Sequence, residues 1–239
     1  MRIFGVGTAL LGVFWSIFAR DTKRTLAFST ISQLGFLMAA PTVAGFYALT
    51  HGLAKSAMFL ITGVLPSRDF ENLRKQGIDR RIWIPLVIAS CSISGFPLLS
   101  GFGAKVLTTK NLLPWQSILM NIAASGTAVV FTKFIFLPNS KLYENYDKGN
   151  KRKVHCSFWL SMLVLIGGLV VANFFYPEAY TIGNIIKSLI IIGIGWLLYW
   201  LFFKKLFLRL PSVAEELEYL IGTMSIILII TFWMILTID

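Results

Sequence analysis

Long apolar runs constrain this 239-residue chain more than any other feature, because several of them exceed 18 residues. A helix of about that length crosses the ~30 Å hydrocarbon layer of a bilayer. Within that layer the backbone must satisfy its own hydrogen bonds, so only helices and closed barrels span it. Hydrophobic residues make up 56% of the chain and charged residues 14%, against about a quarter charged in an average globular protein. The sequence therefore predicts an all-α integral membrane protein.

Apolar segments separated by polar breaks predict about eight transmembrane helices. They lie near 2–19, 25–40, 44–65, 82–112, 114–137, 155–176, 183–208 and 214–237. The first follows Arg2 but ends without a small-x-small cleavage site, so we expect it to stay in the protein as a helix rather than be removed as a signal peptide. Residues 95–103 interrupt the fourth with GFPLLSGFG, whose proline and glycines disfavour a continuous helix. A broken helix at membrane depth is tolerated where it is buried in protein or lines a cavity.

The distribution of basic residues predicts the topology. Net charge is +11, which in a soluble chain would suggest nucleic acid, but here most basic residues occupy four short connections. These contain Arg20, Lys23 and Arg24; then Arg68, Arg74, Lys75, Arg80 and Arg81; then Lys141, Lys148, Lys151, Arg152 and Lys153; then Lys204, Lys205 and Arg209. The positive-inside rule places these connections in the cytoplasm and both termini on the opposite side. Positive loops also attract lipid head groups, and no nucleic-acid partner is expected.

Tyr47, His51 and Lys55 form one stripe on the third helix, because each follows the previous one by four residues. Lys55 is about 16 Å into the apolar segment at ~1.5 Å per residue, near the middle of the membrane. A lysine there costs about 2.5 to 3.5 kcal/mol on insertion scales and is a functional-site candidate. Protons could move along such a stripe. Alternatively, His51 and Tyr47 only bond neighbouring helices, and Lys55 pairs with a fixed carboxylate.

Other lysines in apolar segments have weaker signals. Lys105 follows the interruption of the fourth helix and is a second buried titratable candidate if that break is at mid-membrane. The alternative is that the helix ends near Ser100 and Lys105 reaches the far interface. Lys133 and Lys187 are each about four residues from a helix end, so we expect both to snorkel to the interface and to be structural.

The second helix is short and polar. Asp21 and Lys23 lie in the charged turn that opens it, and Ser29, Ser32 and Gln33 share one face. That face could hold water or make interhelical hydrogen bonds, and spacing alone favours the bonds.

Nothing in the sequence predicts an enzyme site in this chain. It has no phosphate-binding loop, dinucleotide fingerprint, metal-ligand cluster or nucleophile elbow. We therefore expect no catalytic redox site, no cofactor and no metal in this chain, and we expect Cys91 and Cys156 to be inert packing residues.

Three ordered segments resemble one membrane protein family. They read DTKRTLAFSTISQLGF from Asp21, THGLAKSAMFLITGVL from Thr50 and SGFPLLSGFGAK from Ser94. They are similar to the antiporter-like subunits of respiratory complex I, of its photosynthetic relatives and of Mrp-type sodium/proton antiporters. The resemblance implies two inverted five-helix repeats, each with a broken helix. It further implies a hydrated proton path in which Lys55 is the central lysine, His51 its connecting residue and Lys105 the lysine of the second broken helix, with Asp21 and Lys23 in the charged turn.

The resemblance covers only the C-terminal part of that family. It implies a second five-helix repeat at 1–137, a cytoplasmic loop with its following helix at 138–176 and two additional helices at 177–239. The first repeat is absent, and with it a buried glutamate and lysine. Val106 stands where relatives often have an acidic residue.

The function expected from the resemblance is that of a half-length subunit moving protons, and possibly Na⁺, within a multi-subunit Mrp-type antiporter or NAD(P)H:quinone oxidoreductase-like complex. Other membrane subunits, including one that supplies the first repeat, are the expected partners. The expected location is the bacterial inner membrane or a thylakoid membrane. The alternative is a non-conducting structural or assembly subunit, or a fragment.

Overall fold

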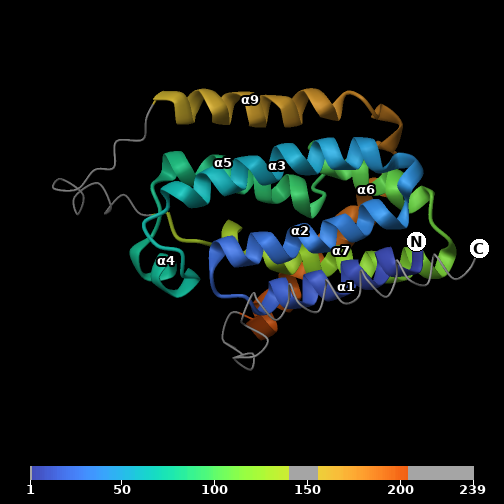
Figure 1. Ribbon diagram of the computed structural model, residues 1–239, viewed down its shortest axis with the longest axis horizontal. Coiled ribbons are helices and arrows are strands. Elements are labelled where there is room, and N and C mark those ends of the chain that lie inside the picture. Colours follow the sequence, from blue (N-terminus) through green and yellow to red (C-terminus); the bar gives the residue numbers. More distant parts are fainter. Residues whose placement is uncertain (1, 140–155, 204–239) are drawn as a thin grey trace, which may run out of the picture. The chain divides into compact units, whose positions relative to one another are not determined.

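The computed structural model describes residues 2–139 and 156–203, and every regular element in these ranges is a helix (Figure 1). In chain order the elements are α1 (Arg2–Phe18), α2 (Thr22–Ala39), η1 (Pro41–Val43), α3 (Ala44–Val64), α4 (Phe70–Gln76), α5 (Arg80–Ser94), α6 (Ser100–Lys110), α7 (Pro114–Ile135), α9 (Cys156–Asn173), η2 (Pro177–Ala179), α10 (Ile182–Leu198) and η3 (Tyr199–Phe203).

Helices occur where the apolar runs predicted them as far as residue 203. The expected helix at 214–237 and the basic loop at 141–153 lie outside the described residues. One element was missed: α4 has seven residues with several charges, so it produces no apolar run.

The described residues contain fewer helices that are long and apolar enough to cross a membrane than the eight predicted spans. Among the described residues, α7, α9 and the continuous stretch Ile182–Phe202 are each long and apolar enough to cross a membrane. The pair α2 and α3 passes as a single span bent by 106° at its break. The prediction instead counted α2 and α3 as separate spans and also included α1 and the interrupted fourth helix. The full count therefore stays a prediction.

The fourth predicted helix is broken as expected. Gly95 ends α5 in the left-handed conformation (φ 87°), which glycine adopts without steric cost. Leu98, in the segment between α5 and α6, also has a positive φ of 79°. The break leaves the carbonyl end of α5 beside the start of α6, inside the helical bundle.

Gly101 lets α6 pass close to α5, and this predicts a strong substitution effect. A Cβ at Gly101 would lie 1.8 Å from the carbonyl oxygen of Ser92, a backbone atom that cannot move aside easily. We expect Gly101→Ala to lower the free energy of unfolding by about 1 to 3 kcal/mol. Gly103→Ala is the matched control, because a Cβ there meets only side chains, the nearest at 3.8 Å. Thermal melting of both variants in detergent measures the difference, and equal melting temperatures would contradict the packing argument.

Helices α1 and α2 pack with their backbones almost in contact. A Cβ at Gly12 would lie 2.4 Å from the Ser32 nitrogen, and one at Gly35 would lie 2.4 Å from the Ala9 nitrogen. Small residues at such an interface let membrane helices approach closely. The Ser32 hydroxyl donates a hydrogen bond to the Ala9 carbonyl across this interface (2.8 Å).

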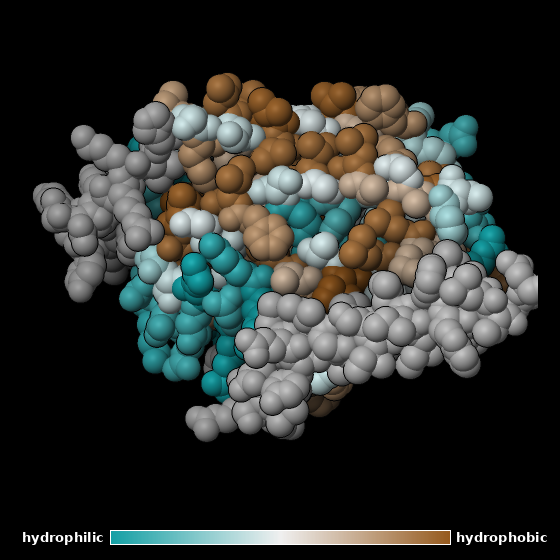
Figure 2. Space-filling model, in the orientation of Figure 1, coloured by the Kyte–Doolittle hydropathy of each residue, from teal (hydrophilic) through white to brown (hydrophobic). Residues whose placement is uncertain are grey.

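The first two basic connections lie together at one end of the bundle. The Thr22 nitrogen donates to the Arg68 carbonyl (2.8 Å), and the Phe70 nitrogen donates to the Arg20 carbonyl (3.2 Å). Figure 2 shows a strongly hydrophilic surface over α4, near these connections, and apolar side chains over α9. The alternation of charge predicted that both connections lie at the same end of the bundle. The side of the membrane that they face stays a prediction.

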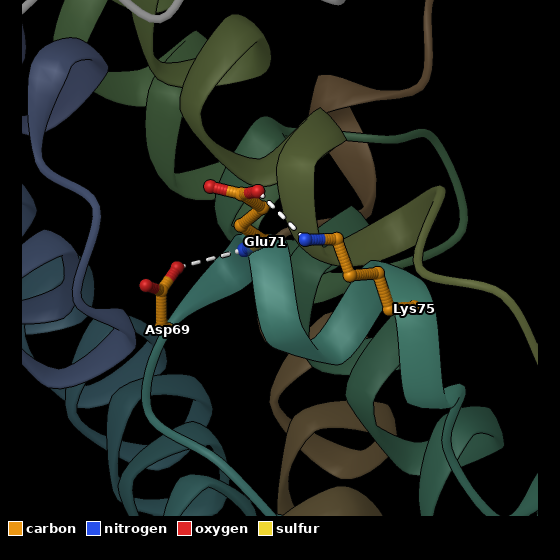
Figure 3. A network of polar contacts seen from close by, with 3 residues as sticks. All are labelled: Asp69, Glu71 and Lys75. Atoms are coloured by element: carbon orange, nitrogen blue, oxygen red, sulfur yellow. Dashed lines mark hydrogen bonds and ion pairs between the residues drawn. The ribbon is translucent and has the colours of Figure 1, made fainter.

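Helix α4 is organised by local polar contacts (Figure 3). The Asp69 carboxylate caps the helix by accepting from the Glu71 nitrogen (2.8 Å), and the Glu71 carboxylate accepts from Lys75 Nζ (2.9 Å). The hydrogen bond and charge of Lys75 lower the pKa of Glu71, and Glu71 raises the pKa of Lys75. Both side chains are exposed, so this pair contributes little to stability.

Candidate functional site

Lys55 lies inside the bundle, on the part of α3 that faces α2 and α7. Only 5% of it is exposed. Its Nζ donates to the Leu26 carbonyl (2.9 Å) and to the Ser29 hydroxyl, and it lies 5.2 Å from the centre of the Phe131 ring. No carboxylate among the described residues lies within ion-pair distance of this amine. The alternative in which Lys55 pairs with a fixed carboxylate therefore does not describe its surroundings in this part of the chain.

The polar face of α2 makes interhelical hydrogen bonds, as its spacing favoured. Ser29 contacts Lys55 on α3, and Ser32 bonds to α1. The Gln33 amide donates to the Thr127 hydroxyl on α7 (3.2 Å) and accepts from the Tyr47 hydroxyl on α3. Residues of one face thus connect three neighbouring helices.

The stripe predicted on α3 is present, and the side chain of His51 at its middle has a ring nitrogen without a hydrogen-bond partner in the described residues. The rings of Tyr47 and His51 stack with centroids 6.3 Å apart and an interplanar angle of 26°. Tyr47 is 3% exposed and uses its hydroxyl to bond Gln33. His51 Nε2 is buried and has no hydrogen-bond partner among the described residues.

A small cavity of about 10 Å³ lies between this stripe and the broken helix. Its polar lining consists of Gln33, Tyr47, Thr50, His51, Ser92 and Lys105. A volume of this size holds about one water molecule. The Ser92 hydroxyl, like His51 Nε2, is buried without a partner in the described part of the chain. Two unpartnered polar groups therefore line a space that fits one water.

Lys105 is partly buried within the helical bundle. It lies in the middle of α6, and its Nζ donates to the Ser94 carbonyl at the end of α5 (3.0 Å). The alternative in which the fourth helix ends near Ser100 is wrong, because Ser100 begins α6. Lys105 lines both the small cavity and a larger one of about 260 Å³.

The charged turn before α2 has a capping role. The Asp21 carboxylate accepts from the Arg24 nitrogen (2.9 Å), which satisfies one of the free N–H groups at the start of the helix. Lys23 is half-buried in the first turn of α2, about one turn before Leu26, whose carbonyl accepts from Lys55.

Lys133 does not snorkel, contrary to the prediction. It is 8% exposed, and its Nζ donates to the carbonyls of Ser16 (3.4 Å), Ile17 and Ala19 (3.1 Å). These carbonyls lie at the end of α1, where a helix has unsatisfied acceptors and the negative end of its dipole. The amine therefore caps α1 from α7. Lys187 is exposed, as expected of a residue near a helix end.

Several site residues escaped the sequence reasoning. Thr127, Ser92 and Ser94 contribute polar atoms near the candidate path. The one available signal was the alternation of serines within the apolar segment of α5, at Ser90, Ser92 and Ser94. No group of three or more His, Cys, Asp or Glu side chains that could hold a metal occurs in residues 2–139 and 156–203.

Comparisons with known proteins agree with this arrangement of helices. Residues 1–132 match the family described as NADH:quinone oxidoreductase/Mrp antiporter, transmembrane. NADH-ubiquinone oxidoreductase chain 5 of Pelomedusa subrufa is 32% identical over 142 residues, which cover 52% of this chain and 23% of that protein. The chloroplastic NAD(P)H-quinone oxidoreductase subunit 5 of Barbarea verna is 25% identical over 228 residues, covering 79% of this chain and 31% of that protein.

A solved structure has the same fold. A chain in the structure of the Mrp complex from Dietzia sp. DQ12-45-1b superposes with a TM-score of 0.64 at 23% identity, covering 95% of this chain and 30% of that one. This chain thus spans under a third of the length of these two relatives and of the solved chain. The matched family accounts for more than half of the chain, so this protein belongs to the NADH:quinone oxidoreductase/Mrp antiporter transmembrane family.

Proposed function

We propose that this chain is a proton-conducting part of a larger membrane complex, either an Mrp-type cation/proton antiporter or an NAD(P)H:quinone oxidoreductase-like assembly. Its proton path runs through Lys55, His51 and Lys105. The observation that carries the proposal is the amine of Lys55, which is buried, hydrogen-bonded only to neutral acceptors, and without a carboxylate partner in the described residues.

Neutral acceptors suit a group that gives up and regains a proton. A carboxylate partner would favour the ammonium form permanently, because an opposite charge stabilises a buried charge. A backbone carbonyl and a serine hydroxyl accept from both the ammonium and the neutral amine. A buried lysine with such partners can therefore release its proton without leaving an unpaired buried carboxylate.

His51 and the small cavity supply the connection toward Lys105. Nε2 of His51 is buried and unpartnered, and the cavity that it lines also touches Lys105. A water in that cavity could carry a proton between the imidazole and the lysine amine. Tyr47 holds its ring against His51 while its hydroxyl is fixed by Gln33.

Lys105 differs from the pattern of relatives in its immediate neighbour. Val106 follows it and lines the larger cavity, at the position where the family resemblance leads us to expect an acidic residue. Without that carboxylate, the side-chain amine of Lys105 has only the Ser94 carbonyl as its hydrogen-bond partner in the described residues. We expect proton release from Lys105 to need no carboxylate relay within this chain.

The proposal includes a partner chain that carries the first inverted repeat. Residues 1–137 correspond to the second inverted repeat with its broken helix, 138–176 to a cytoplasmic loop and following helix, and 177–239 to two further helices. The partner supplies the first repeat with its buried glutamate and lysine. In a bacterial inner membrane or a thylakoid membrane, the basic loops would face the cytoplasm or stroma and both termini the other side.

The alternative is a non-conducting assembly subunit, and one observation favours it. The polar side-chain atoms of Ser32, Gln33 and Tyr47 all form hydrogen bonds between helices. Such bonds are worth about 0.6 kcal/mol each on average within membranes. Under this alternative, substitutions along the path weaken recovery of the complex but leave the transport rate per assembled complex unchanged.

Purification of the tagged full chain from its native membrane under mild detergent tests whether this partner chain is present. We expect it to retain a second membrane chain that carries a first five-helix repeat with a buried glutamate and lysine. The free chain, expressed without other subunits, is the control. Recovery of the native chain alone, with the melting temperature of the free chain, would contradict the proposal.

A further inference from the structure

The larger cavity has an unusual balance of charge. It has a volume of about 260 Å³ and lies between α6, α7 and α10, with Phe36 of α2 at its wall. Three lysines line it, Lys105, Lys110 and Lys187, and no aspartate or glutamate does. Like charges around a common space repel one another, and the repulsion grows as water is excluded. A lining with three lysine side chains and no carboxylate therefore favours an anion in the cavity.

These amines keep donors for a ligand. Each ammonium group has three N–H bonds. Lys105 donates one to the Ser94 carbonyl, and Lys110 donates one to the Tyr176 hydroxyl (3.2 Å). Lys187 is exposed and makes no hydrogen bond to the described residues. Several N–H groups thus remain for oxygen atoms entering the cavity.

The remaining lining suits a ligand with a polar and an apolar part. Ser117 and Asn121 of α7 add a hydroxyl and an amide, while Phe102, Met120 and Ile191 form apolar walls. Lys110 is the last residue of α6 and Lys187 lies near the start of α10, so both mark helix ends, where the membrane interface is expected. Lysine is a common ligand of phosphate groups, acting as a point charge.

We propose that this cavity binds a phosphate-bearing anion, held by Lys110 and Lys187 near its mouth and by Lys105 at its inner end. Either the head group of an anionic phospholipid or free inorganic phosphate supplies this chemistry. The site shares Lys105 with the proposed proton path, but Lys110 and Lys187 lie outside that path, so variants of these two residues test the site separately from the proposed function.

Native mass spectrometry of the purified full chain tests the site with two probes, phosphatidylglycerol in detergent micelles and inorganic phosphate. Phosphatidylcholine, which has no net charge, is the lipid control. A lysine near an anionic lipid surface contributes about fivefold to binding. We expect Lys110→Gln/Lys187→Gln to reduce binding of the relevant probe about 25-fold. Lys110→Arg/Lys187→Arg keeps both positive charges in the cavity and should leave binding within about twofold.

The single variant Lys187→Gln should fold normally, because this exposed side chain makes no hydrogen bond to the described residues. We expect it to bind the relevant probe about fivefold more weakly than the wild type. If the cavity variants lose binding of phosphatidylglycerol alone, the ligand is a lipid head group. If they lose binding of inorganic phosphate alone, the ligand is the free anion. Either result supports the site. Binding of both probes at wild-type strength by the cavity variants, or no binding of either probe by the wild type, would overturn it.

Discussion

We expect replacement of Lys55 by alanine to abolish proton-coupled transport in vesicles that hold the complete complex. The amine is buried and is the central titratable group on the proposed path. Its loss removes a proton-accepting group that neither Ser29 nor the Leu26 carbonyl can replace. A positioned proton-transfer group contributes about 100-fold or more to a rate. We therefore expect the initial transport rate, divided by the amount of assembled complex, to fall by at least that factor.

Lys133→Ala is the matched control for this experiment. It also removes a buried lysine that donates to backbone carbonyls, but one at the end of α1 rather than on the proposed path. The rate per assembled complex should stay close to wild type in Lys133→Ala. If Lys55→Ala lowers recovery of the complex yet transports normally once assembled, the non-conducting alternative is correct.

Lys133→Ala has its large effect on stability instead. The substitution leaves the carbonyls of Ser16, Ile17 and Ala19 without their charged donor in a buried place. It also removes the amine from above the Phe70 ring, 5.6 Å from its centre. Unsatisfied buried acceptors and lost charge-assisted bonds together cost about 2 to 4 kcal/mol. Thermal melting of the purified chain in detergent measures this loss.

Lys187→Ala is the control for the melting experiment, because it removes an exposed lysine from another apolar helix. Its melting temperature should match the wild type. Equal melting temperatures for Lys133→Ala and Lys187→Ala would mean that the bonds from Lys133 to the end of α1 do not stabilise the fold.

Much of the helical arrangement follows from local sequence signals. Apolar runs predict the long helices because the bilayer demands continuous internal hydrogen bonding. The glycines and the proline at 95–103 predict the break between α5 and α6, and its left-handed Gly95 is a conformation that few other residues adopt. Helix α4 escaped prediction because only two of its seven residues, Phe70 and Leu73, are buried apolar side chains, too few to form an apolar run.

The candidate site was only partly predictable, for a physical reason. The depth of Lys55 and its spacing from His51 follow from helix geometry. Its acceptor at Leu26 is a backbone carbonyl, which every residue has, so no side chain in the sequence reveals it. The burial of Lys133 likewise depends on α1 ending beside α7, a tertiary contact that distance from a helix end cannot indicate.

The central claim is that a proton leaves and returns at Lys55, and Lys55→Arg tests it most directly. Arginine keeps a positive charge and hydrogen-bond donors but does not release its proton at physiological pH. The measurement is the proton-transport rate per assembled complex in vesicles. We expect Lys55→Arg to assemble normally but to lose transport, as Lys55→Ala does. Transport at the wild-type rate by Lys55→Arg would contradict it.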